Sequence, residues 1–296
     1  MIHVVGHTAL DHLFRVPFFP PRHRSTYIIS HKVYFGGGGA NVAAAIARLG
    51  GKSTLISAVG SEFPGSDYDR WLESIGVRRE LFVVRGKRTP TAYVYTDDKG
   101  DQITFFEWGA SAFFRNAEAP ALDFVHMATA DPVFNTKIAM KSRFSSFDPG
   151  QDLPWYTKEQ LETILGAIHI LFANRHEMAQ ISEILGISSD EIQSRVPIVI
   201  VTMDAEGSLL HHEGCEYRVP AFPVKLVDPT GAGDAFRGGF LVAFRRGYEP
   251  LVCTRVGTMV ASFVVERVGC QTNLPDWKAM EERYHAFFGP LPEANV

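Results

Sequence analysis

The chain of 296 residues contains little cysteine. Its three cysteines, Cys215, Cys253 and Cys270, are widely separated and form no Cys-x-x-Cys pair. So few cysteines exclude a disulfide framework, and an odd number is awkward for a secreted protein. We therefore expect free thiols in a reducing compartment, the cytoplasm.

Long hydrophobic runs and an excess of charge of one sign are also missing. No apolar stretch approaches the roughly 20 residues that cross a bilayer, and residues 1–6 lack the pattern of a signal peptide. The net charge is −4, from 33 acidic and 29 basic side chains. Nothing in this balance predicts a nucleic-acid or membrane partner. We expect a small-molecule ligand, with any anionic group on it held by local groups.

What the chain does contain is an alternation of short apolar runs with helical patterns. Several runs are almost continuously hydrophobic, which is typical of parallel strands buried on both faces. The pattern predicts an α/β fold in one domain over residues 1–296, with a doubly wound, mostly parallel sheet flanked by helices. The expected strands are Ile2–Val5, Thr54–Ala58, Phe124–Ala128, Ile168–Ala173, Ile198–Thr202 and Leu209–His211, and the expected helices are Ala40–Leu49, Asp67–Ile75, Lys158–Ala167, Glu177–Leu185, Asp234–Arg246 and Leu251–Val265.

Two stretches, at about residues 13–35 and 91–108, interrupt this alternation. Both contain β-branched and aromatic residues without helical periodicity. In the second stretch, Thr91–Tyr95 and Ile103–Phe106 flank Asp97–Gly100, which predicts a hairpin with a turn at Asp-Lys-Gly. We expect these strands to form a small separate β-sheet, a lid over a site.

A glycine-rich segment near the C-terminus has the most informative chemistry. The sequence Asp-Pro-Thr-Gly-Ala-Gly-Asp spans residues 228–234, and an apolar helical pattern follows it. Small residues at Gly231–Gly233 let backbone N–H groups approach an anion, which the N-terminus of a helix also favours. Asp234 is suited to accept a proton from an attacking hydroxyl. The alternative is a simple turn whose Asp234 only caps the helix.

A second glycine-rich segment lies near the N-terminus. Four consecutive glycines, Gly36–Gly39, run into a helical pattern that begins with Ala40 and Asn41. Glycines permit close approach of a ligand, and the Asn41 amide can both donate hydrogen bonds to vicinal hydroxyls and accept them. The alternative is a flexible loop before a core helix.

The two segments together make the sequence resemble the ribokinase-like (PfkB) family of carbohydrate and nucleoside kinases. That family has a Gly-Gly-x-x-x-Asn type of segment near the N-terminus and a Gly-Ala-Gly-Asp segment near the C-terminus, in the order found here. The resemblance implies an ATP-dependent kinase in which Asp234 is the catalytic base and the amides of Gly231, Ala232 and Gly233 bind the transferred phosphoryl group. The substrate-binding residues it implies are Asp11, near the end of the first strand, Gly37, Gly38 and Asn41.

The resemblance also implies a nucleotide site. In the family an Asn-x-x-Glu motif organises Mg²⁺ and phosphate largely through water, and Asn174 and Glu177 fit it. The turn from Thr202 to Gly207 resembles a nucleotide-binding Thr-x-Gly-x-x-Gly turn, but Asp204 replaces the usual glycine, which puts the loop shape in doubt. In relatives the segment that matches residues 269–273 contacts the nucleotide or a monovalent cation such as K⁺, and both alternatives stay open. The remaining residues that we expect to bind the nucleotide are Thr230 and Asn273.

The acceptor is harder to infer. No basic cluster for a sugar phosphate lies in the lid strands, which are instead aromatic, and aromatic faces suit a nucleobase. The segment Asp-Pro-Gly-Gln at residues 148–151 also resembles archaeal-type nucleoside kinases of the family. We therefore favour phosphorylation of the 5′-hydroxyl of a nucleoside, with Phe106 and Gln151 among the substrate-binding residues. A ribokinase- or fructokinase-type sugar kinase is the alternative. A non-catalytic small-molecule-binding protein on the same fold is a remote alternative. In several relatives the lid also forms a homodimer interface. The other aromatic residues of the lid region are Tyr93, Tyr95, Phe105, Trp108, Phe113 and Phe114.

Overall fold

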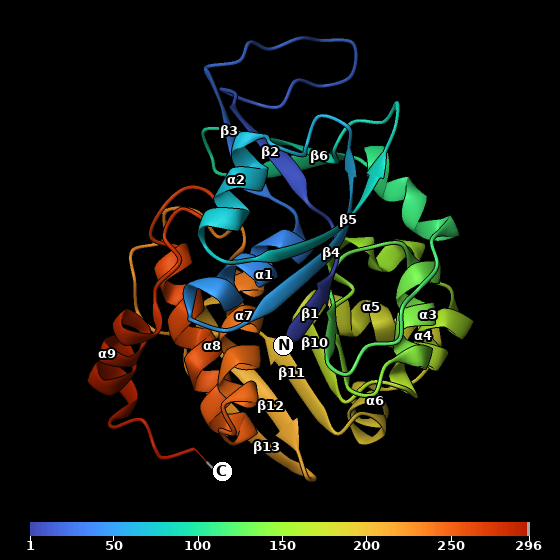
Figure 1. Cartoon of the computed structure of the whole chain (residues 1–296). Helices are drawn as coiled ribbons and strands as arrows, with labels where there is room; N and C mark the ends of the chain where they lie inside the picture. The colour runs from blue at the N-terminus through green and yellow to red at the C-terminus, as the bar shows by residue number, and fades with distance from the viewer. Residues whose placement is uncertain (295–296) are drawn as a thin grey trace.

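The computed structural model describes residues 1–294, and its centre is a mostly parallel sheet of nine strands (Figure 1). The strand order is β13-β12-β11-β10-β9-β8-β1-β4-β5, with only β12 and β13 antiparallel to their neighbours. The strands are β1 (Ile2–Val5), β4 (Ser53–Gly60), β5 (Arg78–Val84), β8 (Val125–Met127), β9 (Ser145–Phe147), β10 (Ile170–Asn174), β11 (Ile198–Thr202), β12 (Ser208–His212) and β13 (Cys215–Val219).

Helices cover both faces of this sheet, which confirms the predicted fold class. Neighbouring residues of one strand point to opposite faces, so Val4 packs into one hydrophobic cluster and Val5 into the other. Both side chains are fully buried, as expected for a strand covered on two sides. The first cluster includes helices α1 (Gly38–Arg48), α7 (Ala232–Arg245) and α8 (Pro250–Val264), and the second includes α3 (Pro132–Lys141), α4 (Lys158–Leu165) and α5 (Arg175–Leu185).

The predicted strands and helices are all present, with ends that differ by a few residues. Several elements were not predicted, because their patterns are weak. The edge strand β5 mixes charged and apolar residues, β9 has three residues, and β13 is mostly exposed. The other unpredicted elements are α3, α6 (Ser189–Arg195) and α9 (Trp277–Phe288), with the short 3₁₀ turns η1 (Gly109–Asn116), η2 (Gly150–Trp155) and η3 (Asp204–Glu206).

The predicted lid is a separate four-stranded sheet with the order β3-β2-β6-β7. The hairpin turn forms as expected, because the Asp97 carboxylate accepts hydrogen bonds from the amides of Lys99 and Asp101. In Figure 1 the lid lies above the large sheet, and the loop between β2 and β3 projects furthest from it. The lid strands are β2 (Ala9–Arg15), β3 (Ser30–Gly36), β6 (Thr91–Thr96) and β7 (Gln102–Glu107), and helix α2 (Asp67–Ser74) lies nearby.

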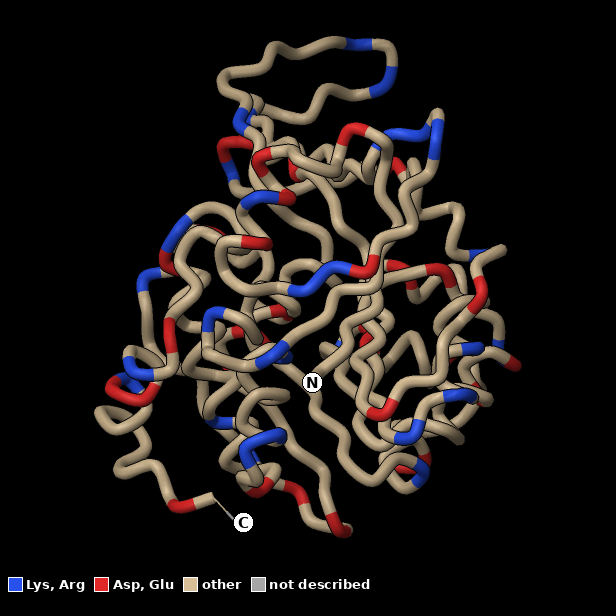
Figure 2. Tube along the Cα trace, in the orientation of Figure 1, with Lys and Arg blue, Asp and Glu red and all other residues tan. Residues whose placement is uncertain are grey.

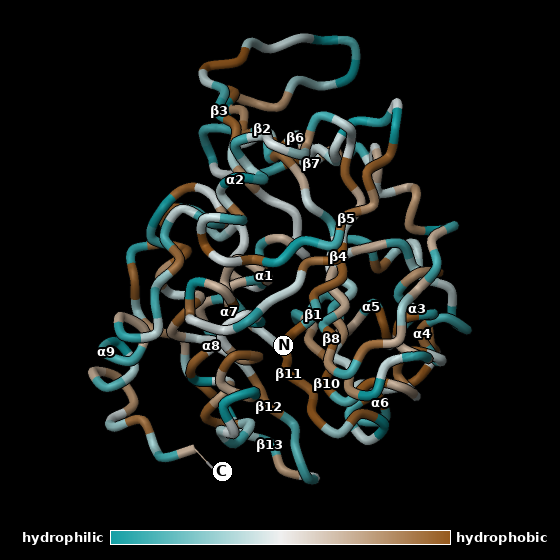
Figure 3. The backbone as a smooth tube through the Cα atoms, viewed as in Figure 1, coloured by the Kyte–Doolittle hydropathy of each residue, from teal (hydrophilic) through white to brown (hydrophobic). Residues whose placement is uncertain are grey.

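Charge and hydropathy follow the layers of the fold. Figure 2 shows acidic and basic residues interspersed over the whole trace, without a large region of one sign. In Figure 3 the most hydrophobic segments gather in the central strands, among them β10 and β11. Within residues 1–294, no helix combines the length and apolar character needed to cross a membrane. The cytoplasmic location stays a prediction.

Candidate active site

A cleft of about 940 Å³ lies between the small sheet and the carboxyl ends of parallel strands of the large sheet. Ligands of open α/β sheets bind at this edge, where the loops that follow the strands meet. The cleft is lined in turn by His7 after β1, Thr129 after β8, Asp148 after β9, Asn174 at the end of β10 and Thr202 at the end of β11. The sheet therefore gathers residues that are far apart in the sequence.

The N-terminus of α7 opens into this cleft, as the glycine-rich segment predicted. Gly231 precedes the helix with φ of 80°, a conformation that favours glycine. A Cβ atom at this position would also lie 2.6 Å from that of Cys270, so a side chain is excluded. No side chain caps the helix. The Ala232 amide donates to the Pro229 carbonyl at 3.2 Å, so in this conformation Gly231 and Gly233 offer the amides available to an anion.

Asp234 lies in the first turn of α7 and faces the cleft. Its Oδ2 accepts a hydrogen bond from Asn41 Nδ2 at 2.8 Å, and its Oδ1 lies 3.5 Å from Arg237 Nη1. Burial raises the pKa of Asp234, while Arg237 and the Asn41 hydrogen bond oppose that rise. The Asn41 amide is itself fixed, because its oxygen accepts from Gln271 Nε2 at 2.9 Å. Such a carboxylate is suited to hold a proton transiently.

Asp11 also lines the cleft, but its position corrects our expectation. It lies within the lid strand β2, because β1 already ends at Val5. Asp11 is 7% exposed, and its carboxylate packs directly against Gly36, where no side chain would fit. Burial raises the pKa of Asp11 to about 7.

The predicted glycines Gly37 and Gly38 line the cleft next to Asp11. Gly37 has φ of 91°, and a Cβ atom there would meet the backbone of His7 and Ala9. A Cβ atom on Gly38 would lie 3.7 Å from Asp234 Oδ1. The glycine segment therefore brings the backbone close to the Asp234 carboxylate.

The two faces of the lid sheet differ, which corrects the prediction of an aromatic wall. Phe106 lines the cleft, whereas Phe105 points away from it and is 62% exposed, because successive residues of a strand alternate. Tyr93 and Tyr95 share the outer face with Phe105 in the strand register. The cleft-facing residues of these strands are Ala9, Asp11, Ala92, Val94, Gln102, Thr104 and Phe106.

The remaining aromatic residues of this region belong to packing. Phe114 is fully buried in the second hydrophobic cluster, and Phe113 contacts Phe82. The Trp108 ring packs edge-on against His7, with ring centroids 5.1 Å apart, and supports Phe106. One ring, Phe106, is therefore placed to contact a ligand from the lid.

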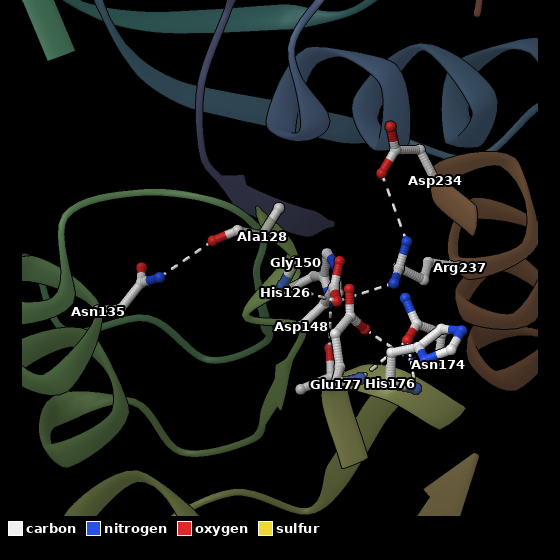
Figure 4. A network of polar contacts seen from close by, with 11 residues as sticks. His126, Ala128, Asn135, Asp148, Gly150, Asn174, His176, Glu177, Asp234 and Arg237 are labelled. Atoms are coloured by element: carbon white, nitrogen blue, oxygen red, sulfur yellow. Dashed lines mark hydrogen bonds and ion pairs between the residues drawn. The ribbon is translucent and has the colours of Figure 1, made fainter. Parts of the chain in front are cut away.

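The predicted Asn-x-x-Glu motif connects β10 to α5. Asn174 Oδ1 accepts from the amides of His176 and Glu177, and Glu177 Oε2 accepts from the Asn174 amide at 2.8 Å, which completes a capping box. Both residues also line the cleft. Figure 4 shows Glu177 beside Asp148, with Arg237 between Asp148 and Asp234. The motif thus begins a helix and also supplies a carboxylate to the site.

The predicted nucleotide turn also lies in the cleft. Thr202, Gly207 and Thr230 line it. Asp204, which replaces the usual glycine, adopts φ of 51°, so this loop keeps a left-handed residue without a glycine; aspartate tolerates that conformation better than most residues.

Asn273 is not among the residues that line the cleft. Its Nδ2 donates to the carbonyl of Phe263 near the end of α8, which places the side chain in the packing behind the site. Cys270, three residues earlier, does line the cleft. The segment therefore reaches the cleft through Cys270, whereas the side chain of Asn273, the residue that we predicted, points away from it.

Sequence reasoning missed several polar residues of the cleft. His7 Nε2 lies 2.9 Å from Asp152 Oδ2, and His7 Nδ1 lies 2.8 Å from Ser111 Oγ. This buried network supports the turn that carries Gln151, which lines the cleft as predicted. Asp148 and Arg237 were also missed, although Arg237 follows Asp234 at a helical spacing of three residues. That spacing, which places both on one helix face, was the available signal.

Comparison with known proteins matches this arrangement. The sequence model of the pfkB family carbohydrate kinases matches residues 1–277. The nucleoside kinase of Methanocaldococcus jannaschii is 43% identical over 286 residues, which cover 94% of this chain and 95% of that protein. The crystal structure of a nucleoside kinase from that organism, titled an archaeal member of the ribokinase family, has a TM-score of 0.92 at 42% identity, with 96% and 98% of the two chains covered. The nucleoside kinase of Burkholderia thailandensis in complex with inosine has a TM-score of 0.90 at 25% identity, with 100% and 99% covered.

Proposed function

The chain belongs to the pfkB family of carbohydrate kinases, as an ATP-dependent phosphotransferase acting on a hydroxyl group, and we propose that its acceptor is the 5′-hydroxyl of a nucleoside. The reaction is ATP + nucleoside → ADP + nucleoside 5′-monophosphate. The relatives described above, which are nucleoside kinases, support this substrate class. Residues of the cleft itself support it independently.

The observation that carries the proposal is that the described residues of the acceptor end include no lysine or arginine. The lid presents Ala92, Val94, Thr104 and Phe106 to the cleft. Among the described residues that line the cleft, Arg237 is the only lysine or arginine, and it lies beside Asp234 rather than under the lid. A sugar phosphate would need a cation at the acceptor end, whereas a nucleobase is satisfied by an aromatic ring and polar amides.

The reaction follows from the positions of these groups. The ribose hydroxyls bind Asp11 and Asn41, which places the 5′-oxygen near Asp234. The 5′-oxygen forms a bond to the γ-phosphorus while the bond from phosphorus to the bridging oxygen breaks, and that electron pair leaves with ADP. Asp234 takes the hydroxyl proton. Amides at the start of α7 stabilise the negative charge on the transferred group.

The donor end suits a nucleotide and a hydrated metal ion. In the described residues no group of three or more His, Cys, Asp or Glu could hold a metal directly. Mg²⁺ retains much of its water shell, however, so the Glu177 carboxylate and the Asn174 side chain fit contact through water. When bound, Mg²⁺ neutralises phosphate charge. Apolar residues suited to a nucleobase of the donor line the cleft further along: Phe222, Pro223, Val224, Leu226, Ala261 and Val265.

The test is ADP release with Mg·ATP and a panel of acceptors. The panel contains inosine, adenosine, guanosine and cytidine, with ribose and fructose as sugars. We expect turnover with nucleosides and little with the sugars. Turnover with the sugars alone would support the ribokinase- or fructokinase-type alternative. Saturable binding of a nucleoside without ADP release, in wild type as in Asp234→Asn, would support a binding protein instead.

A monovalent cation and a homodimer are two further parts of the proposal. Asp228 joins the two loops at the nucleotide end, accepting from the amides of Thr230 at 3.0 Å and Gly269 at 3.1 Å. Two loops held together in this way are suited to bind K⁺ between them, and turnover measured in K⁺ and in choline would test this.

The outer lid face exposes Val33, Ile103 and Phe105, and a second copy would cover it. Phe105→Asp would then yield a monomer in light-scattering measurements.

A further inference from the structure

Arg237 has a position that the reaction described above does not use. It lies one turn after Asp234 on α7, lines the cleft and is only 8% exposed. A guanidinium keeps its charge even when buried, and burying it is costly unless it is paired. A buried cation that lines the cleft needs an explanation.

The contacts of Arg237 leave much of the guanidinium unused. Nη2 lies 2.7 Å from Asp148 Oδ1, and Nη1 lies at the longer distance of 3.5 Å from Asp234 Oδ1. Nε is buried and has no partner among the described residues. A guanidinium has five N–H donors, so one strong bond to Asp148 and one weak contact satisfy it incompletely (Figure 4).

The guanidinium also borders the anion site. A Cβ atom on Gly233 would lie 2.5 Å from Arg237 Nη1, so the charge packs directly against the backbone whose amide faces the cleft. The surrounding side chains are otherwise acidic, with Asp148, Asp234 and Glu177 close enough to act on one another. ATP would add further negative charge to a cleft whose only lysine or arginine, within residues 1–294, is Arg237.

We propose that Arg237 is a catalytic residue whose guanidinium donates hydrogen bonds to the transferred phosphoryl group, beside the amide of Gly233. Asp148 holds the guanidinium while the cleft is free of nucleotide. Arg237 keeps its protons throughout, and Asp234 still takes the hydroxyl proton. The proposal rests on the proposed phosphoryl transfer. An arginine at this position stabilises charge that grows in the transition state, as arginines do in other phosphoryl-transfer enzymes.

The first test compares Arg237→Gln with Arg79→Gln. Arg79 is the matched control, because it is a partly buried arginine paired with Asp69 at 2.9 Å outside the cleft. We expect Arg237→Gln to lower kcat about 10²–10³-fold, the usual cost of removing one transition-state donor, and Arg79→Gln to change it less than threefold. All assays use the acceptor that the wild type phosphorylates fastest, nucleoside or sugar. Failure of the nucleoside assignment therefore leaves the test of Arg237 intact.

The second test separates catalysis from structural support. The acceptor's affinity is measured in the presence of Mg·ADP, with and without aluminium fluoride, which mimics the phosphoryl group in flight. In Arg237→Gln the acceptor affinity with Mg·ADP should stay within threefold of wild type. The increase in that affinity on adding aluminium fluoride should be about 100-fold smaller in the variant than in wild type. An equal loss in both conditions, or no loss in either, would overturn the proposal.

Variants of Asp148 complete the design. Asp148→Asn keeps the guanidinium and should lower kcat less than tenfold; a loss equal to that of Arg237→Gln would mean that only the ion pair matters and would overturn the proposal. If Arg237→Gln does not fold, because Asp148 is left buried and unpaired, the double variant Asp148→Asn/Arg237→Gln removes both charges. It should show the same loss of kcat and of aluminium fluoride affinity, and near-wild-type values would equally overturn the proposal.

Discussion

The two ends of the cleft are built differently. The end near α7 combines backbone amides with the charged side chains of Asp148, Glu177, Asp234 and Arg237, whereas the lid end offers apolar walls and one carboxylate, Asp11. Transfer of a phosphoryl group needs strong, fixed electrostatics. Recognition of an uncharged acceptor needs shape, stacking and a few hydrogen bonds. The comparison indicates that rate depends on one end and acceptor choice on the other.

The largest expected effect is at the α7 end. Asp234→Asn keeps the volume of the side chain but cannot accept the proton, so kcat should fall about 10²–10⁴-fold while nucleotide affinity changes little. Steady-state ADP release and nucleotide titration measure the two quantities. Asp98→Asn, in the exposed lid turn, is the control. A fall of less than tenfold in Asp234→Asn would remove Asp234 from its role as base.

The lid end should affect acceptor affinity instead. Phe106→Ala should raise the KM for a nucleoside about 10–100-fold, since stacking on one base contributes about 1–3 kcal/mol, with a smaller effect on kcat. Its neighbour supplies the control, because Phe105 lies on the other face of the same strand. Phe105→Ala should leave that KM within twofold. Equal effects of the two substitutions would show that the lid does not discriminate by face.

The acceptor end should also depend on pH. Because burial raises the pKa of Asp11 to about 7, its carboxylate is lost as pH falls through that value. We expect nucleoside affinity, measured without ATP, to weaken about fivefold from pH 7 to pH 6, as the ionised fraction of Asp11 falls, and to stay nearly flat in Asp11→Asn.

The same pKa makes an opposite prediction for stability. The folded chain binds a proton at Asp11 more tightly than the unfolded chain does, since the usual pKa is 3.8. Between about pH 4 and pH 7 this group therefore stabilises the ligand-free fold increasingly as pH falls. Thermal unfolding of wild type against Asp11→Asn over that range would detect the difference, and parallel curves would contradict the raised pKa.

The smallest effect is expected at the network behind the lid end. Asp152→Asn keeps the size of the side chain but weakens its bond to His7, which supports Phe106 and the turn of Gln151. We expect the nucleoside KM to rise about threefold with kcat unchanged, in keeping with the modest energy of one hydrogen bond. A larger loss of kcat than of affinity would place the network at the α7 end instead.

The sequence predicted backbone features better than side-chain partners. Gly231–Gly233 and Gly36–Gly39 were identified because only glycine permits such close approach and positive φ, and the motifs led directly to Asp234 and Asn41, whose side chains meet. The lid sheet was predicted from its strands, but not which ring faces inward, because the register of each strand is set by tertiary packing. For the same reason the sequence did not separate Phe106 from Tyr93, Tyr95 and Phe105, which lie on the outer face.

Side-chain partners were missed where they come from distant segments. Asp148 follows β9, and Arg237 belongs to α7, so no local pattern links them. The sequence marked the Asp-Pro-Gly-Gln segment without giving its aspartate a role. Asn273 was chosen from a segment that reaches the cleft at Cys270, but the Asn273 side chain donates to the Phe263 carbonyl of α8 instead, and only the folded chain specifies such a direction.

The position of Asp11 on the lid strand β2 links acceptor binding to phosphoryl transfer. Because Asp11, the proposed ligand for the ribose, is part of the lid itself, an acceptor that binds Asp11 on one side and Asn41 on the other would tie the lid to α1. Binding of the acceptor would therefore itself bring the lid into the position needed for phosphoryl transfer, and we expect ATP alone to be hydrolysed slowly. A nucleoside that lacks its 5′-hydroxyl should make the bridge without being phosphorylated and should raise that background hydrolysis.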